Sequence, residues 1–492
     1  MLDIKWKPQK TLSIPLHQQI SNYMKNKIMI GEWTIGTKLP PQRHLAELFQ
    51  VNRSTIVTAL DELAADGLIE SKVGSGTKVI NNTWGLLTST PPPDWINYVK
   101  SGIHKPNISI IQQINQAEAE PGFIRLGTGE LSPELLPNEK MAEILQFDHT
   151  RPLSLGYAEP KGSLSLRKSV SAYLKEKGIA ASPESILIVS GGLQALQLIA
   201  IGLLERGSTI LHETPSYLNS VHVFQSAGMN LFGIPLDDEG IQCDAIARIK
   251  RQHKAALLYT IPTFHNPTGT LMSEKRRLEL MGVCQKESIP IIEDDVYGDL
   301  WLEESSQKPL KANDTEGNVL YIGSMSKSLS PGLRIGWIVG PEPVMERLSD
   351  IKMQTDYGSS SVSQFAVDKW LCSGLYKEFL KDLKVELRFR RDFTNQILKK
   401  HFSEIATWSI PKGGFYIWLR LQPKVSTRKL FDLALQEKIL INPGSVYDKH
   451  DDQHLRISYS YASLEQLEEG LIQLAQLIKH YSLKGTTHFR IP

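Results

Sequence analysis

The chain has 492 residues, more than a single hydrophobic core usually serves, so two or more domains are expected. Its composition of 41% hydrophobic, 22% charged and 8% aromatic residues is that of an ordinary globular protein and argues against long disorder. The formal net charge of +2 is too small to indicate a nucleic-acid partner, so only local charge can do so.

The sequence gives no sign of export, membrane insertion or metal binding. The first ten residues contain no apolar signal segment, and no run of 18 apolar residues occurs. Cys243, Cys284 and Cys372 are widely spaced and form no CxxC or Cys/His cluster, so neither a disulfide framework nor a metal site is expected. All three are predicted to be buried thiols, and the protein is predicted to be cytoplasmic.

A first domain over residues 1–80 is predicted from three short helical patterns and a hairpin. The first helix has apolar residues on one face, namely Leu16, Ile20, Tyr23, Met24 and Ile28. A second helix around Leu45, a turn at 51–52 and a third helix from about Arg53 follow. This order and spacing are typical of a helix-turn-helix.

The N-terminal turn of the third helix is the part that would enter the DNA major groove. It carries Arg53, Ser54 and Thr55, and a bidentate contact from Arg53 to a guanine would discriminate against other bases by roughly 1–3 kcal/mol. Arg43 and the two hydroxyls are expected to contact phosphates. Residues 1–80 hold ten Lys and Arg against seven Asp and Glu, an excess of three that fits a nucleic-acid partner and a merely solvated surface equally well.

The segment GLIESKVGSGTKVI alternates polar and apolar residues, which predicts a tight hairpin around Gly74, Ser75 and Gly76. Lys72 and Lys78 make its tip basic, as suits a wing over the minor groove. The wing residues assigned to DNA are Lys72, Gly74 and Gly76.

These motifs carry a family resemblance. PLHQQI, GTKLPPQRHLAELFQVNRSTIVTALDELAADGLIE and GSGTKV together resemble the GntR family of winged-helix regulators over nearly all of residues 15–79. The resemblance implies double-stranded operator DNA as the partner. One departure is PPQR, where the family more often has Ser and Glu before the Arg.

A linker is predicted over residues 81–118, because Pro91, Pro92 and Pro93 block helix continuation. From 119 to 492, short apolar runs alternate with longer helical patterns, which predicts βαβ units around a mainly parallel sheet. The predicted fold class is therefore multidomain, α and α/β.

The segment NVLYIGSMSKSLSPGLRIGW is predicted to be the chemical centre of the large domain. A short apolar strand runs into a loop of Ser, Gly and Lys, and an Arg follows. This arrangement suits a phosphate-tethered aldehyde: Lys327 would form a Schiff base, Ser324 and Ser326 would donate to the phosphate, and Arg334 would pair with it. A lone lysine in a polar loop is usually just solvated, so other segments must support this interpretation.

Two segments do so at the ends of predicted strands. In SILIVSGGLQALQLIAIGLL, the backbone N–H groups of Gly192 and Leu193 would point at an anion from the start of a helix. In IPIIEDDVYGDLW, a buried strand ends in acidic residues, which is costly unless a cation or donor faces them. Asp294 facing a pyridine nitrogen would satisfy this requirement, and Tyr297 would reach the phenolic oxygen of the same ring.

Two further side chains follow strands. Asn266 in TIPTFHNPTGT would donate to the phenolic oxygen, although an Asn before Pro equally often only satisfies a turn. Tyr217 in ETPSYLN would stack on the pyridine face, although an isolated aromatic is more often part of the core.

The order of these motifs from about 119 to 480 resembles fold-type I aminotransferases, especially the branch with kynurenine and aminoadipate aminotransferases. The resemblance implies pyridoxal 5′-phosphate (PLP) as cofactor. It also implies that Tyr157 in LGYAEPKGSLSLR reaches the cofactor phosphate of the neighbouring subunit, and that Arg456 in LRISYSY binds the α-carboxylate of the ligand. IPKGGFYIWLRL fits the late β segment of that family.

A GntR-type reader fused to such a domain resembles the MocR subfamily over almost the full chain. The resemblance implies a transcription regulator that senses an amino acid or related amine through aldimine exchange, and a head-to-tail homodimer. Two alternatives stay open: a working aminotransferase acting on amino acids, and a regulator that senses PLP itself.

Overall fold

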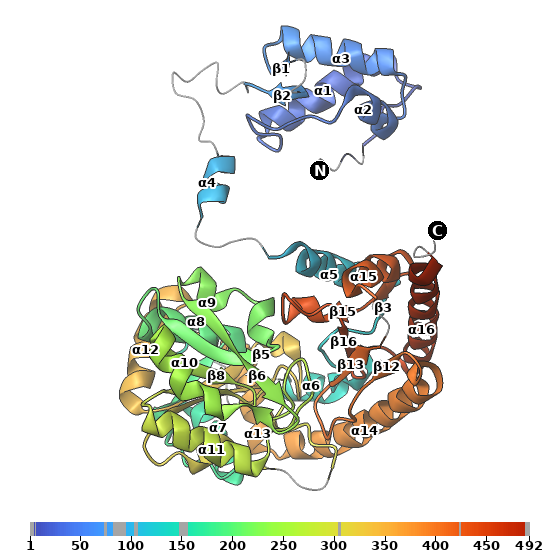
Figure 1. The fold of residues 1–492 in the computed structure, drawn as a ribbon. Coiled ribbons are helices and arrows are strands. Elements are labelled where there is room, and N and C mark those ends of the chain that lie inside the picture. The colour runs from blue at the N-terminus through green and yellow to red at the C-terminus, as the bar shows by residue number, and fades with distance from the viewer. Residues whose placement is uncertain are drawn as a thin grey trace. The chain divides into compact units, whose positions relative to one another are not determined.

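The computed structural model describes residues 4, 6–72, 76–81, 95–102, 107–146, 156–303, 307–422 and 425–487 (Figure 1). The chain forms two compact units, Met1–Ile103 and His104–Pro492, each with its own hydrophobic core.

The smaller unit is a winged helix-turn-helix, as predicted. Its elements are α1 (Leu16–Met29), α2 (Gln42–Phe49), α3 (Arg53–Ala65), β1 (Ile69–Lys72) and β2 (Gly76–Val79). The strands pair antiparallel with Ile69 opposite Val79. The helix α2 ends where Gln50 adopts a left-handed conformation (φ 55°), which turns the chain toward α3.

Aromatic and aliphatic side chains fill the core of this unit. The Trp6 ring stacks on Tyr23 with centroids 4.6 Å apart, and Phe49 meets both rings edge-on. Phe49 is almost fully buried, as is Leu45 on the same face of α2. These contacts fix α2 against α1, and hence the position of the turn that precedes α3.

The predicted linker is too long at its C-terminal end. Within it, α4 (Trp95–Ser101) exposes Trp95, Tyr98 and Val99 to solvent. By contrast, α5 (Ser109–Ala119) buries one face in the core of the large unit, through Ile110, Ile111, Ile114 and Ala117. Because its apolar residues recur at helical spacing, α5 belongs to the large unit and not to a linker.

The large unit is built on an eight-stranded, mainly parallel sheet in the order β4-β11-β10-β9-β8-β5-β6-β7. Only the pairings of β11 and of β7 are antiparallel. The bounds are β4 (Ile186–Val189), β5 (Thr209–Thr214), β6 (Asn230–Asp237), β7 (Gly240–Ile241), β8 (Ala255–Thr260), β9 (Ile291–Asp294), β10 (Val319–Ser324) and β11 (Gly336–Val339). Parallel strands bring their carboxyl ends to the same edge of the sheet, where ligands bind in folds of this type.

Helices and a second sheet complete the large unit (Figure 1). The helices are α6 (Asn138–Ile144), α7 (Leu164–Glu176), α8 (Gly192–Leu203), α9 (Val223–Ser226), α10 (Ile246–His253), α11 (Glu274–Lys286), α12 (Glu342–Thr355), α13 (Ser361–Cys372), α14 (Leu375–Phe402), α15 (Thr427–Gln436) and α16 (Leu464–Thr487). The four-stranded antiparallel sheet has the order β12-β13-β16-β15, and β3 pairs with β14. These strands are β3 (Ile124–Arg125), β12 (Ala406–Thr407), β13 (Tyr416–Leu421), β14 (Ile439–Leu440), β15 (Asn442–Pro443) and β16 (His454–Ser458).

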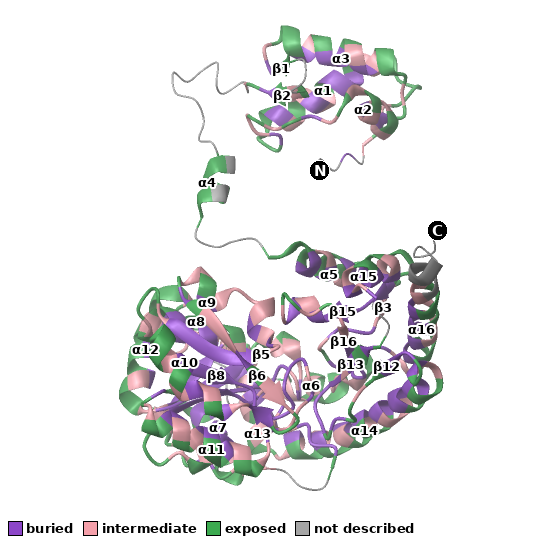
Figure 2. Cartoon of the chain, viewed as in Figure 1, coloured by how far each residue is buried: buried purple, intermediate pink, exposed green. Residues whose placement is uncertain are grey.

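Burial follows this layering. The strands of the large sheet are mostly buried, and α14 and α16 are buried on one face and exposed on the other (Figure 2). No helix among the described residues is long and apolar enough to cross a membrane. Cys243 and Cys284 are buried as predicted, but the prediction was wrong for Cys372, which is exposed near the end of α13.

The core of the small unit should be sensitive to the loss of one ring. We expect Phe49→Ala to lower the free energy of unfolding of the small unit by about 3–5 kcal/mol, because it leaves a cavity beside the rings of Trp6 and Tyr23. Calorimetry of the full chain would measure this as an earlier transition for one unit only. Glu47→Ala, on the exposed side of α2, is the control; equal shifts for the two variants would contradict the packing described.

Candidate functional site

A cavity of about 400 Å³ lies at the carboxyl ends of the central strands of the large sheet. Every residue that the sequence assigned to the cofactor or ligand, except Tyr157, lines it: Gly192, Leu193, Tyr217, Asn266, Asp294, Tyr297, Ser324, Ser326, Lys327, Arg334 and Arg456. These residues come from six separate sequence segments, which the fold brings together.

Asp294 closes the inner end of this cavity. It ends β9, is 5% exposed, and accepts a hydrogen bond from the Tyr259 hydroxyl at 2.7 Å on Oδ2. Its other oxygen, Oδ1, is buried and has no partner. Burial and the neighbouring Asp295 carboxylate raise the pKa of Asp294 to about 6. A cationic ring N–H is the group that would satisfy Oδ1 and favour the charged carboxylate.

Lys327 follows β10 and enters the same cavity. Its Nζ donates to the backbone oxygen of Gly129 at 2.7 Å, and its side chain is half-buried. A single carbonyl partner leaves the amine accessible to an aldehyde in the cavity. This placement contrasts with the solvated lysine that a polar loop would ordinarily carry.

The end of the cavity that the sequence predicts to hold a phosphate is formed by α8 and the loop after β10. The helix starts at Gly192, after Gly191 in a left-handed conformation (φ 88°), so its free N–H groups open onto the cavity. A Cβ at Gly191 would lie 2.6 Å from Nη2 of Arg334, so only glycine lets that guanidinium sit beside the helix start. The Ser326 backbone N–H donates to Ser324 Oγ at 3.1 Å, which keeps both hydroxyls at this end.

Arg456, the predicted partner of a ligand carboxylate, also lines the cavity. It is buried, and its guanidinium carbon is 4.2 Å from the centre of the Tyr416 ring and 4.9 Å from that of Tyr447. It donates to Asn266 Oδ1 at 2.8 Å and to the Gly127 carbonyl at 2.6 Å, and its Nε has no partner. A buried guanidinium without a carboxylate partner is suited to a ligand carboxylate.

The remaining predicted residues of the ring pocket surround this space. Asn266 uses its amide oxygen for Arg456, which leaves its amide nitrogen free to donate into the cavity. Tyr297 is hydrogen-bonded to the Tyr416 hydroxyl at 2.9 Å, and Tyr217 is half-buried in the cavity wall.

Some residues that line the cofactor cavity were not predicted from the sequence. Tyr416 and Tyr447 line the cavity, as do four residues of α5: Ile111, Ile114, Asn115 and Glu118. Tyr416 lay within a segment noted only for its strand character. The residues of α5 lay within the supposed linker, where their helical apolar spacing was the available signal.

Tyr157 is not part of this cavity within one chain. It is 88% exposed, and its ring lies 4.9 Å from that of Tyr357. Its predicted role requires a second subunit.

The predicted DNA-contacting residues lie on exposed parts of the small unit. Arg53 and Ser54 are exposed at the start of α3, Thr55 is half-buried, and Arg43 is exposed on α2. Gln42, in the position where the GntR pattern more often has Glu, accepts from the Arg53 guanidinium at 3.1 Å. The departure from the family pattern thus still supplies an acceptor that orients Arg53.

The wing is described only in part. Lys72 is exposed and pairs with Glu70 at 3.2 Å, and Gly76 begins β2 with φ 85°. Gly74 lies outside the described residues.

Comparison with known proteins identifies both units. Residues 16–79 match the model of bacterial regulatory proteins of the gntR family, and residues 121–474 match that of class I and II aminotransferases. The chain belongs to the MocR-type regulators of the GntR family.

Relatives of full length support this assignment. The chain is 55% identical over 472 residues to the uncharacterized HTH-type transcriptional regulator YisV of Bacillus subtilis, covering 96% of this chain and 98% of that one. It is 34% identical over 454 residues to the HTH-type transcriptional regulator NorG of Staphylococcus aureus, covering 90% and 99%.

Solved structures resemble the large unit. Pyrococcus horikoshii kynurenine aminotransferase superposes with a TM-score of 0.72 and 28% identity, covering 77% of this chain and 96% of that one. LysN, the α-aminoadipate aminotransferase of Thermus thermophilus, gives 0.71 and 28%, covering 80% and 100%. The fold and these neighbours identify PLP as the cofactor of this regulator's large domain, and the unpartnered Asp294 Oδ1 fits its ring nitrogen.

The raised pKa of Asp294 predicts a pH dependence for cofactor binding. The charged carboxylate, which holds a cationic ring, predominates above about pH 6 and is lost below it. PLP affinity should therefore fall by up to about tenfold per pH unit below that value, measured by absorbance titration of cofactor-free protein.

Asp294→Asn is the control, because an amide does not titrate in this range. Its affinity should be weaker at neutral pH and lack the acid limb. Parallel pH profiles of the two proteins would contradict the role of Asp294.

Proposed function

We propose that this regulator senses an amino acid or a related amine in its large domain and answers by changing how its small unit binds operator DNA. The observation that carries the proposal is the cavity in which Lys327, Asp294 and Arg456 meet, in a chain that also holds a winged helix-turn-helix. The protein would act in the cytoplasm, where its DNA is found.

We assign the residues of the cavity different roles in holding the cofactor. When bound, PLP presents an aldehyde that either a lysine amine or an incoming effector amine can hold. Lys327 would hold the cofactor in the resting protein, and Asp294 would keep a proton on its ring nitrogen. Ser324, Ser326 and Arg334 would fix the phosphate.

The chemical class of the effector is inferred from Arg456. Arg456 is buried without a carboxylate partner, which supports an effector that carries a carboxylate as well as an amine. Its fork is already turned toward the cavity by Asn266 and the Gly127 carbonyl. An effector carboxylate would therefore find a guanidinium held in place.

The response would pass through α5. This helix forms one wall of the cavity, and it is the first helix of the large unit after the segment that leads from the DNA-binding residues. An effector that contacts α5 differently in two states of the domain shifts the balance between them, and only such unequal affinity can do so.

We also propose a head-to-tail homodimer. Tyr157 is too exposed to serve the cavity of its own chain, which supports a role at the cofactor phosphate of a second copy.

An aminotransferase remains the second candidate function, because the cavity keeps every residue assigned to amine chemistry. A regulator that senses PLP alone would need no effector amine. Steady turnover of an amino donor with a 2-oxo acid favours the enzyme, and a change in promoter occupancy on adding only PLP favours the PLP sensor.

Lys327→Ala should abolish the visible absorbance of the bound cofactor and the response of DNA binding to amines. The reason is that, among the described residues, Lys327 is the one lysine that lines the cavity and can hold the aldehyde. Spectroscopy and DNA-binding titrations with a panel of amino acids would measure both. Lys449→Ala, an exposed lysine outside the cavity, should leave them unchanged; a normal amine response in Lys327→Ala would exclude sensing at this site.

Arg53→Ala should reduce discrimination between operator and random DNA by roughly 1–3 kcal/mol, the value of one bidentate base contact. Arg43→Ala, the predicted phosphate contact, should instead weaken binding to both DNAs equally. Equilibrium binding at fixed salt measures the two ratios. Equal losses on both DNAs for Arg53→Ala would argue against direct base reading.

A further inference from the structure

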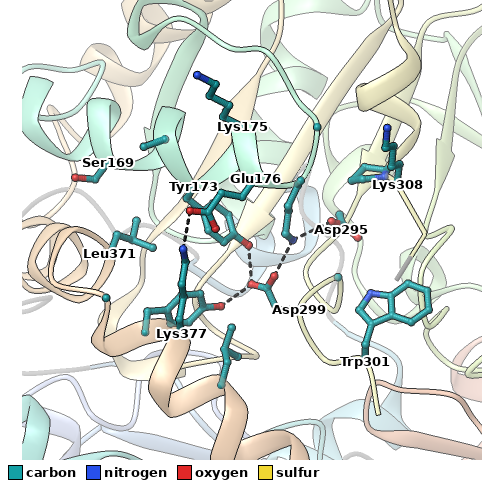
Figure 3. A pocket seen from close by; sticks show the side chains of 18 of the residues that line it. Ser169, Tyr173, Lys175, Glu176, Asp295, Asp299, Trp301, Lys308, Leu371 and Lys377 are labelled. Atoms are coloured by element: carbon teal, nitrogen blue, oxygen red, sulfur yellow. Dashed lines mark hydrogen bonds and ion pairs between the residues drawn. The ribbon is translucent and has the colours of Figure 1, made fainter. Parts of the chain in front are cut away.

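A second, larger cavity of about 1100 Å³ opens in the large unit beside α7, the segment after β9 and the start of α14 (Figure 3). It shares no lining residue with the cofactor cavity. The two are nevertheless adjacent in sequence, because Asp294 lines the cofactor cavity and Asp295 lines this one. Successive residues at a strand end point to opposite sides, which explains the separation.

The floor of this second cavity is a buried ion-pair network. Lys177 Nζ lies 2.9 Å from Asp299 and 3.5 Å from Asp295. The Tyr173 hydroxyl donates to Asp299 (Figure 3), and so does the Tyr376 hydroxyl. Although burial alone would raise it, Lys177 and these hydroxyls hold the pKa of Asp299 below its usual value. The floor is thus a fixed, hydrogen-bonded platform in which one lysine faces two carboxylates, so the positive charge that an anion needs must come from other lysines of the lining.

The carboxylates of the cavity are already engaged. Asp295 and Asp299 share Lys177, and Glu176 pairs with Lys377 at 2.6 Å. Asp295 keeps one buried oxygen, Oδ1, without a hydrogen-bond donor. A ligand hydroxyl or water would satisfy that oxygen.

Four lysines of the lining are uncompensated. Lys168, Lys175, Lys308 and Lys384 have no carboxylate within ion-pair distance among the described residues. Lys384 is half-buried, and burial lowers its pKa. The other three are exposed side chains of the lining. An unpaired ammonium in a partly buried wall, as at Lys384, is stabilised by an anion, and three further lysines around the same space favour an anion with several charges.

We propose that this cavity is a second ligand site, which binds a compact anion carrying two or more negative charges, such as a phosphorylated or polycarboxylate metabolite. The lysines hold its charges, and Asp295 Oδ1 accepts from a hydroxyl of the anion or from a water bound to it. The site is distinct from the one at which PLP and the amine effector bind, so its existence does not depend on the proposed sensing function.

Two residues that line the second cavity, Tyr376 and Asp295, connect it to the predicted cofactor residues. Tyr376 is hydrogen-bonded to Ser328, the neighbour of Lys327. Asp295 is the neighbour of Asp294 and contributes to its raised pKa. An anion in this cavity therefore adds charge beside both residues.

Calorimetric titration of the full-length, PLP-saturated protein tests the proposal, with inorganic phosphate and citrate as probes at constant ionic strength. We expect saturable binding of one anion per chain for at least one probe. Lys384→Gln should weaken it by about tenfold or more, the value of one lost charge-assisted contact. Lys381→Gln, an exposed lysine on the same helix α14 outside the cavity, should bind like the unaltered protein.

The outcomes separate the sources of the anion. Tighter phosphate indicates a phosphorylated ligand, and tighter citrate a polycarboxylate. The absence of saturable heat with both probes, or equal affinity in Lys384→Gln and the unaltered protein, would overturn the proposal. An unchanged cofactor spectrum shows that Lys384→Gln is folded, and Lys308→Gln provides a second variant on another wall of the cavity.

Discussion

Three consecutive carboxylates, Glu293, Asp294 and Asp295, are buried at the end of β9, and the large unit depends on how each is satisfied. Unpaired buried charge is costly, so each needs its own donors. Glu293 accepts from the backbone N–H groups of Leu310 and Lys311, and Asp295 from the Tyr321 hydroxyl. Of the three, only Asp294 lines the cofactor cavity, and its Oδ1 has no hydrogen-bond donor among the described residues, so a cationic ring in the cavity could satisfy it.

The same strand end explains why function gathers at one edge of the sheet. Strands β8, β9 and β10 run parallel, so the loops after them converge, and the cavity takes Asn266, Asp294 and Lys327 from the three of them. Loops can carry these polar groups because the buried strands beneath them fix their starting points. The helix α5 then covers the cavity from outside the sheet.

The fold and most of the cofactor site were predictable from sequence because their signals are local. A strand followed by a glycine pair predicts a phosphate site within a few residues, and a strand that ends in a buried acid predicts a partner such as a ring nitrogen. The α5 wall and Tyr416 were not predicted, because their role depends on which distant segments the fold places opposite them. Cys372 was wrongly expected to be buried, since cysteine is usually buried and its place near the end of α13 is a tertiary matter.

The two cavities differ in the kind of selectivity they can have. In the cofactor cavity, Arg456 is held by Asn266 and Gly127, and the other polar groups would each meet a specific atom of a rigid ring, so geometry would select the ligand. In the second cavity, the charges sit on long lysine side chains around a fixed floor, so net charge selects more than shape does. Because Asp294 and Asp295 are consecutive and Asp295 contributes to the raised pKa of Asp294, charge placed at the second site would also change the pKa of Asp294. Neighbouring residues, Asp294 and Asp295, would thus couple a site that selects its ligand by shape to a site that selects its ligand by charge.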